Sequence, residues 1–313
     1  MIKKVHIIVF AVSSVVFIQN SFSQNFGRVG DWKKCRREIL LQAGVSGFLG
    51  DLGGLDDIGT HLSPIDMEID LTKQAISLAY RYKFFKNFAF HTSFNYLTVA
   101  GDDKLTKEPF RQNRNLNFKS DVFEVATRAE LCLMSAKIGH RYGIKKTMSR
   151  RHKSRSWEFI AFVGIGAFYF EPKGLNASGE YVNLRPLHTE GQGLPGGPAQ
   201  YKNIAISIPM GFDLRIIFHK FWSVGIEYNF RKTFTDYIDD VSTIYYDNQE
   251  LKKNYGVLSS QMANPTINTI PDATSTDYQR GNSKNMDSYM SFQFTVGRFF
   301  PPKRHKARLR SKF

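Results

Sequence analysis

Few cysteines and no long apolar run restrict what this sequence can encode. Cys35 and Cys132 are the only cysteines, which excludes a disulfide-rich scaffold and leaves one disulfide or two free thiols as alternatives. The longest apolar core, Ile7–Ile18, spans 12 residues, whereas a membrane-spanning helix needs about 20. Any passage of this chain through a membrane must therefore rely on strands.

Patterns for metal binding and phosphate binding are also missing. The 8 histidines are scattered without metal-ligand spacing, and the glycines of 50–54 are not followed by the Lys-Ser/Thr of a phosphate loop. Hard cations favour carboxylate clusters, so a calcium site from Asp51, Asp56 and Asp57 stays open as an alternative. We otherwise expect no metal, no cofactor and no small-molecule substrate.

Carboxylate pairs are the nearest approach to a catalytic pattern. They occur at Asp56-Asp57, Asp102-Asp103 and Asp239-Asp240, with His61 and His188 in neighbouring loops. A peptidase would need these groups to converge on one water, whereas adjacent acids in polar loops usually form turns. A hydrolase built on His91 and Ser93 is weaker still, because at period two these residues are most simply packed inside the fold. We expect no catalytic residue, with an outer-membrane hydrolase as an alternative.

Acidic residues are in short supply, with 28 against 43 basic ones and a net charge of +15. No nucleic-acid motif accompanies this charge, and residues 1–23 have the form of an export signal: Lys3 and Lys4, an apolar core, then small residues at Ser21–Ser23. We therefore expect an exported protein without a nucleic-acid partner. The predicted organisation is a signal peptide at 1–23, a basic lead-in at 24–37, one domain at 38–300 and a basic tail at 301–313.

The stretch from Ile204 to Lys232 has the most informative pattern. Large apolar residues occupy every second position from Ile204 to Phe218 and again from Trp222 to Phe230, and small or polar residues lie between them. A period of two with one apolar face predicts two strands joined at His219-Lys220. Each strand is long enough for the ~9–11 residues of a tilted membrane-spanning strand. A soluble sandwich, with the intervening charges in water, is the alternative.

Six further segments show the same alternation, which makes eight strands: 38–49, 75–85, 88–96, 116–133, 157–170 and 288–300. The connections alternate between tight turns and the long loops 50–73, 101–115, 171–203 and 234–287. Short turns facing the periplasm and long loops facing outside are typical of an outer-membrane barrel. We therefore predict an all-β, eight-stranded antiparallel up-and-down transmembrane barrel in the outer membrane of a Gram-negative bacterium. Hairpins inside the two longest loops would raise the number of strands to ten.

Several charged residues fall on the inward face of these strands. An eight-stranded barrel has an interior just wide enough for side chains to fill, so these charges should pair across it and leave no pore. The residues concerned are Glu124, Arg128, Glu130, Asp213, Arg215, Glu227 and Arg231.

Charge also differs between the two ends of the predicted barrel. The connection 135–156 carries eight basic residues and no acid until Glu158, and the tail carries six, whereas the loops 50–73 and 234–287 are acidic. A basic periplasmic rim can dock an acidic partner or inner-leaflet phosphates, or can simply be solvated. The candidate docking residues are Lys145, Lys146, Arg150, Arg151, Lys153, Arg155, Arg304, Arg308 and Arg310.

Several loop motifs carry a resemblance to a known family. They are FLGDLGG at 48–54, AGDD at 100–103, NRNLNFKSD at 113–121, FYFEPKG at 168–174, LHTEGQGL at 187–194 and RKTFTDYIDDVSTIYYD at 231–247. In this order they resemble the PorG-type outer-membrane barrels of the Bacteroidetes type IX secretion and gliding machinery. The motif positions taken as candidate site residues are Gly50, Asp51, Gly53, Gly54, Asp102, Asp103, Arg231, Thr233, Asp236, Tyr237, Asp239 and Asp240.

The resemblance implies a non-enzymatic component of that machinery, which sits in outer-membrane lipid and anchors or assembles a periplasmic ring of proteins. The SRRHKSR stretch at 149–155 and the tail are longer and more basic than expected of the family. The alternative is a generic small outer-membrane barrel with a structural or adhesive role.

Overall fold

The computed structural model describes residues 35–52, 71–106, 108–138, 155–218 and 221–300. The expected signal peptide and basic tail lie outside these residues, as do most of the basic lead-in and most of the basic connection.

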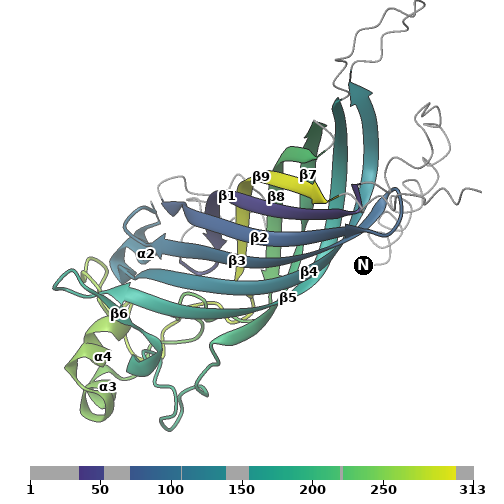
Figure 1. Cartoon of the computed structure of the whole chain (residues 1–313). Helices are drawn as coiled ribbons and strands as arrows, with labels where there is room; N and C mark the ends of the chain where they lie inside the picture. The colour runs from purple at the N-terminus through teal and green to yellow at the C-terminus, as the bar shows by residue number, and fades with distance from the viewer. Residues whose placement is uncertain (1–34, 53–70, 107, 139–154, 219–220, 301–313) are drawn as a thin grey trace, which may run out of the picture.

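Eight long strands form one antiparallel sheet that closes on itself (Figure 1). The barrel strands are β1 (Arg37–Leu49), β2 (Lys73–Lys83), β3 (Phe88–Asp102), β4 (Asn117–Ile138), β5 (Arg155–Leu175), β7 (Ile204–Phe218), β8 (Trp222–Thr233) and β9 (Ser288–Phe300). Each strand pairs with its neighbours in the chain, and the closing ladder joins β1 to β9 from Arg37↔Phe300 to Leu49↔Ser288. The chain is therefore an eight-stranded up-and-down barrel, as predicted.

The connections differ at the two mouths of the barrel. One mouth carries the turn 84–87, the β4–β5 and β7–β8 connections and both ends of the barrel sequence. The other carries the long connections, which contain α2 (Pro109–Arg114), β6 (Tyr181–Asn183), the 3-10 turn η5 (Arg185–Leu187), α3 (Asn248–Tyr255) and α4 (Val257–Ala263). None of the helices in the described part is long and apolar enough to cross a membrane.

Three sequence expectations need correction here. The basic stretch from Ser135 was expected to break the strand pattern, but β4 runs on to Ile138 and β5 starts at Arg155, because the two strands pair with each other past the end of β3. The loop at 101–115 and the loop at 234–287 were expected to be irregular, but both contain helices. Within the described loops no hairpin adds two strands to the barrel, and the one extra strand, β6, pairs only with β5.

Large apolar side chains cover the outside of the barrel. They include Leu41, Phe94, Ile165, Ile206 and Phe294, each more than half exposed. In a soluble protein such a surface would be an association site. On a closed barrel it forms the apolar band that faces lipid. The outward series predicted from Ile204 and Trp222 shows the expected alternation, with Ser223, Glu227 and Asn229 facing inward.

Charged side chains fill the inside of the barrel. Arg128 bonds Glu227 twice, with Nη1–Oε1 at 2.7 Å and Nη2–Oε2 at 2.6 Å, and its guanidinium carbon lies 3.8 Å from the ring centroid of Phe162. Toward either mouth lie further pairs: Arg231–Glu124, Arg81–Glu130, Arg215–Glu38, Arg215–Asp213 and Lys83–Glu158. The predicted pairing of inward charges across the lumen is confirmed. His91 and Ser93 are buried in the same wall, as expected of packing residues.

Cys132 lies on β4 with a free thiol, so the alternative of a disulfide to Cys35 is excluded.

The central pair generates a stability prediction. Arg128→Ala should leave the buried carboxylates of Glu227 and Glu130 without their shared cation, and removing one partner of a buried pair costs about 3–5 kcal/mol. Urea unfolding of the refolded barrel in detergent, followed by its heat-modifiable migration, measures this loss. Thr127→Val, a neighbour that faces outward, is the matched control and should unfold like the wild type. Equal unfolding of both variants would contradict the role of the pair.

The filled lumen also predicts that the barrel does not conduct ions. Because ion pairs span the interior from Glu124 to Glu158, the reconstituted barrel should carry essentially no current in planar bilayers. Single-channel recording against protein-free membranes measures this. A stable porin-like conductance, or uptake of a tracer into liposomes, would show that the lumen opens.

Candidate functional site

Four connections close over one mouth of the barrel and form the loop cap, defined here as residues 50–52, 103–116, 176–203 and 234–287. Figure 1 shows α2, α3 and α4 gathered at this end. A buried apolar cluster lies where the loop cap meets the barrel strands and includes residues of both. Its large members include Phe48, Leu97, Phe118, Phe168, Phe170, Ile238 and Tyr289. Burial of this cluster holds the loops on the barrel.

Arg114, at the end of α2, joins three of the connections. Its guanidinium forms a two-bond contact with Asp103, at 2.8 and 2.9 Å, and also donates to the backbone oxygens of Asp51 and Arg280. Asp103 accepts the backbone N–H of Leu116 as well. A planar guanidinium suits this geometry because it donates in several fixed directions at once.

Arg280 joins the last connection to the loop after β5. It donates to Glu190 at 2.9 Å and to the backbone oxygen of Asp240 at 2.6 Å. The Asp240 carboxylate accepts from the hydroxyls of Thr189 and Tyr201. These residues are all buried, so every charge in the group is matched by a charge or a donor from another loop.

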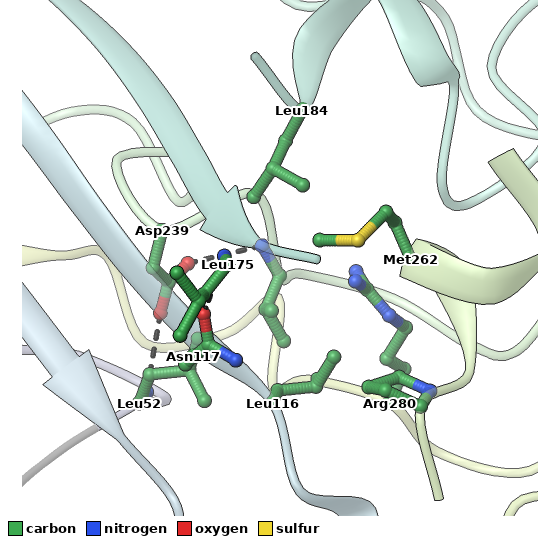
Figure 2. Close-up of a pocket in the computed structure, with 10 residues that line it drawn as sticks. Leu52, Leu116, Asn117, Leu175, Leu184, Asp239, Met262 and Arg280 are labelled. Atoms are coloured by element: carbon green, nitrogen blue, oxygen red, sulfur yellow. Dashed lines mark hydrogen bonds between the residues drawn. The ribbon is translucent and has the colours of Figure 1, made fainter. Parts of the chain in front are cut away.

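Asp239 has a similar structural role. Its two carboxylate oxygens accept the backbone N–H groups of Leu52 and Val241, at 3.1 and 3.0 Å, and Figure 2 shows this carboxylate between the two segments. The pocket beside it, lined also by Leu116, Met262 and Arg280, leaves room for about one water molecule. This space is too small for an organic substrate.

Several carboxyl groups of the cap are buried near each other. Burial raises the pKa of Asp236 to about 8, although the nearby Ser242 side chain opposes the shift. Burial also raises the pKa of Asp239 and of Asp287 well above the usual value, and the negative charges of neighbouring aspartates add to both shifts. The pKa of Asp240 rises only to about 6, because Arg280 offsets part of the effect of burial. The cap therefore favours neutral aspartic acids at Asp236, Asp239 and Asp287.

The structure brings together most of the motif residues taken from the sequence. Asp51, Asp103, Asp239 and Asp240 belong to the cap network, and Tyr237 stacks on Tyr201 with 4.6 Å between ring centroids. Thr233 donates from Oγ1 to the backbone oxygens of Thr235 and Asp287, which ties β8 to β9 below the cap.

The remaining candidate residues lie elsewhere. Arg231 lies in the lumen with Glu124, Gly50 is exposed at the end of β1, and the side chain of Asp102 accepts the backbone N–H of Lys104. Outside the described residues are Gly53, Gly54, Asp56, Asp57, His61 and every docking candidate except Arg155. The docking residues therefore stay predictions.

Sequence patterns missed several residues that hold the cap together. Arg114 and Glu190 lie inside two of the motifs, at 113–121 and 187–194, so the motifs could have indicated them. Arg280 and Asp287 lie in the long last connection outside any motif. Their importance comes from contacts across 40 to 90 residues of chain, which no local pattern reveals.

Among the described residues no group of three or more His, Cys, Asp or Glu side chains could hold a metal ion. His188 stacks on Tyr255, with 4.2 Å between ring centroids, rather than facing a carboxylate. The arrangement supports a structural role, in which the carboxyl groups join loops to each other.

The buried acids predict that the cap loosens as pH rises. Since the pKa of Asp236 is higher in the folded cap than in a free chain, the folded state holds more protons between about pH 4 and pH 8, and its stability falls as pH increases through that range. Asp236→Asn keeps the shape and removes the ionisation. It should slow proteolytic cleavage of the cap at pH 8.5 relative to the wild type and change little at pH 5.

The control for this comparison is Asp272→Asn, an exposed aspartate in the same connection, which should match the wild type at both pH values. Cleavage of the Asp236→Asn protein at the wild-type rate at pH 8.5 would show that this carboxyl does not ionise in the cap.

Comparisons with known proteins add little to this picture. No protein-family model matches the chain, and no curated protein matches it either. Two solved structures of Ail, the attachment invasion locus protein of Yersinia pestis, one of them in complex with the heparin analogue sucrose octasulfate, share 10% identity with the chain at TM-scores of 0.34 and 0.33. Both alignments cover 85% of this chain and 99% of Ail. Neisserial surface protein A (NspA) gives a TM-score of 0.30 and 7% identity over 84% of this chain and 97% of its own. Similarities this low carry no argument about function, and the fold assignment rests on the strand pairing of the chain itself.

Proposed function

We propose that this protein is a non-enzymatic outer-membrane barrel that anchors a periplasmic ring complex of a type IX secretion or gliding apparatus. The apolar band around the barrel suits a lipid environment, and the ion pairs in the lumen leave the interior to structure rather than transport. Function then belongs to the two ends of the barrel.

The observation that carries the proposal is the position of the basic segments. β4 and β5 meet the connection 139–154 at the same mouth where β1 begins and β9 ends, opposite the loop cap. The connection and the tail beyond Phe300 therefore both leave from one rim, and they hold most of the net positive charge of the chain. A rim of one sign attracts partners of the opposite sign and speeds their association.

The identity of the partner comes from the family resemblance. Five of the six motifs that resemble PorG-type barrels contribute residues to the loop cap: Asp51, Asp103, Arg114, Glu190 and Asp240. These motif residues join the loops of the cap in this chain, which supports the proposal that the motifs reflect a common architecture. The type IX ring is what that family would place at the opposite rim.

The absence of enzymatic activity is part of the same proposal. Three carboxylates of the described pairs are engaged by other groups: Asp103 by Arg114, Asp239 by two backbone N–H groups, and Asp240 by two hydroxyls. We expect the purified barrel to cleave neither peptides nor lipid A.

A generic small barrel with an adhesive role is the second candidate. Exposed apolar residues on the outward face of the cap favour it, among them Phe110, Val257 and Ile267. Such residues suit contact with another surface. This candidate predicts no association with a periplasmic ring, so the experiment below separates the two.

The test is purification of the tagged barrel from mild detergent and identification of the proteins that co-elute at low and high salt. Neutralising Arg150, Arg151, Lys153 and Arg155 with Gln should reduce recovery of ring proteins several-fold at low salt. High salt should weaken recovery by the intact chain, because charge contacts are screened over about 10 Å at 0.1 M salt.

The matched control neutralises four exposed lysines at the cap end, Lys202, Lys252, Lys253 and Lys284, and should leave recovery unchanged. Equal loss from both variants would mean that total charge matters and the rim does not. Recovery of no ring protein, even from cross-linked cells, would favour the adhesive barrel.

A further inference from the structure

β4 extends past the strand that covers one of its edges. The β3–β4 ladder ends at Phe88↔Leu131, and the last contact on that side is the Cys132 N–H donating to Asn87 O at 2.8 Å. On its other side, β4 pairs with β5 for five more regular pairs, from Met134↔Phe159 to Ile138↔Arg155. Figure 1 shows β4 and β5 continuing beyond the other strands at the end opposite the helices.

These five residues, Met134–Ile138, are here called the β4 edge. Within the described part of the chain they pair only with β5. β5 itself is covered on its far side by β7 as far as Ser156↔Ile217. The projection is therefore a small sheet with one edge that no other described strand covers.

Strand geometry shows which backbone groups the edge presents. Cys132 points its N–H toward β3, and the register shifts by one residue between Cys132 and Met134. Alternation after this bulge directs the N–H and C=O of Ser135 and Lys137 away from β5. The bulge lies at the foot of the projection, so the five residues after it form a regular template for another strand.

This edge must lie in water. Five residues of strand extend the projection by about 15 Å beyond the level of Asn87. Unpaired backbone groups are not tolerated in hydrocarbon, and the projection ends in Lys137 and Arg155 at the start of a basic connection. The side with the β4–β5 connection is the periplasmic side in the proposed orientation.

We infer that the β4 edge is a docking site for an extended, acidic segment of a periplasmic protein, which adds to the sheet as a further strand. This inference builds on the proposed function by naming the mode of contact. Strand addition takes its affinity from main-chain hydrogen bonds and its specificity from side-chain contacts. The exposed Leu133 and Met134, at the foot of the edge, offer apolar contacts to such a segment.

Charge decides which occupant fits. A second copy of this chain would bring two basic hairpins together, and the tail and lead-in of the chain are also basic, so all three would be repelled. Glu158, opposite Ser135 in the ladder, is already paired with Lys83 and offers no free negative charge. An acidic segment would meet complementary charge at Lys137, at Arg155 and in the basic connection that follows the edge.

Photo-crosslinking in intact cells tests the inference. A benzoylphenylalanine placed at Ser135 should link to an acidic stretch of one periplasmic protein, identified by mass spectrometry of the adduct. The same probe at Trp222 should give no such adduct. Trp222 is also exposed near this rim, but its strand is paired on both sides. Adducts of equal yield at both positions, or an adduct to a second copy of this chain, would overturn the inference.

A backbone variant separates this contact from attraction to the basic rim. Ser135→Pro removes the outward N–H and keeps every charge, so it should reduce partner recovery at least several-fold at low salt, provided that heat-modifiable migration shows a folded barrel. If the rim-neutralised protein loses the partner but Ser135→Pro does not, the proposed function stands and the inference that the β4 edge is the docking site is rejected. If Ser135→Pro fails to fold, the crosslink at Ser135 decides alone.

Discussion

The buried ion pairs of the lumen are the constraint on which the rest of the structure depends. Eight strands close into a barrel too narrow for bulk water and too wide to be filled by backbone alone, so side chains must fill it. Here the filling is charged, and charges leave water only at a large cost unless each has a partner in good geometry. Arg128 meets this condition with two bonds to Glu227 and a contact with Phe162, and Arg231 and Arg215 meet it with Glu124 and Glu38. The partners lie on different strands, so each pair also holds the closed register. An interior filled in this way leaves little room for the passage of ions or solutes.

Much of the fold could be predicted from the sequence because its main signal is local. Alternation with a period of two sets the face of each residue, and a strand slipped by one residue would turn the lumen charges of β8 into the lipid. The bounds of β7 and β9 accordingly agree closely with the pattern from Ile204 and Ser288. The ends of β4 and β5 were missed because the basic composition after Ser135 resembles a loop. Pairing between the two strands, which no single segment displays, extends them.

Contacts between distant segments of the loop cap could not be predicted from sequence patterns. Motifs indicated Asp51, Asp239 and Asp240, but the residues that connect them, Arg280 above all, became visible only through contacts with distant segments. The sequence did not predict the helices α3 and α4 for another reason. Their connection is polar and lacks a clear apolar stripe, and the helices pack on the cap through few residues such as Leu251 and Met262. The stability of such short helices comes more from tertiary packing than from intrinsic helix propensity.

The two ends of the barrel differ in how their polar and charged groups are paired. At the cap, charged and polar groups from four connections bond to one another, as Arg114 and Arg280 show. At the other end β4 leaves the backbone groups of Ser135 and Lys137 directed away from β5, beside a connection whose charge is not balanced by nearby acids. Open strand edges and unbalanced charge are both costly to leave exposed in a protein that must avoid non-specific pairing. Their coincidence at one rim is what the proposed docking of another molecule at that rim would account for.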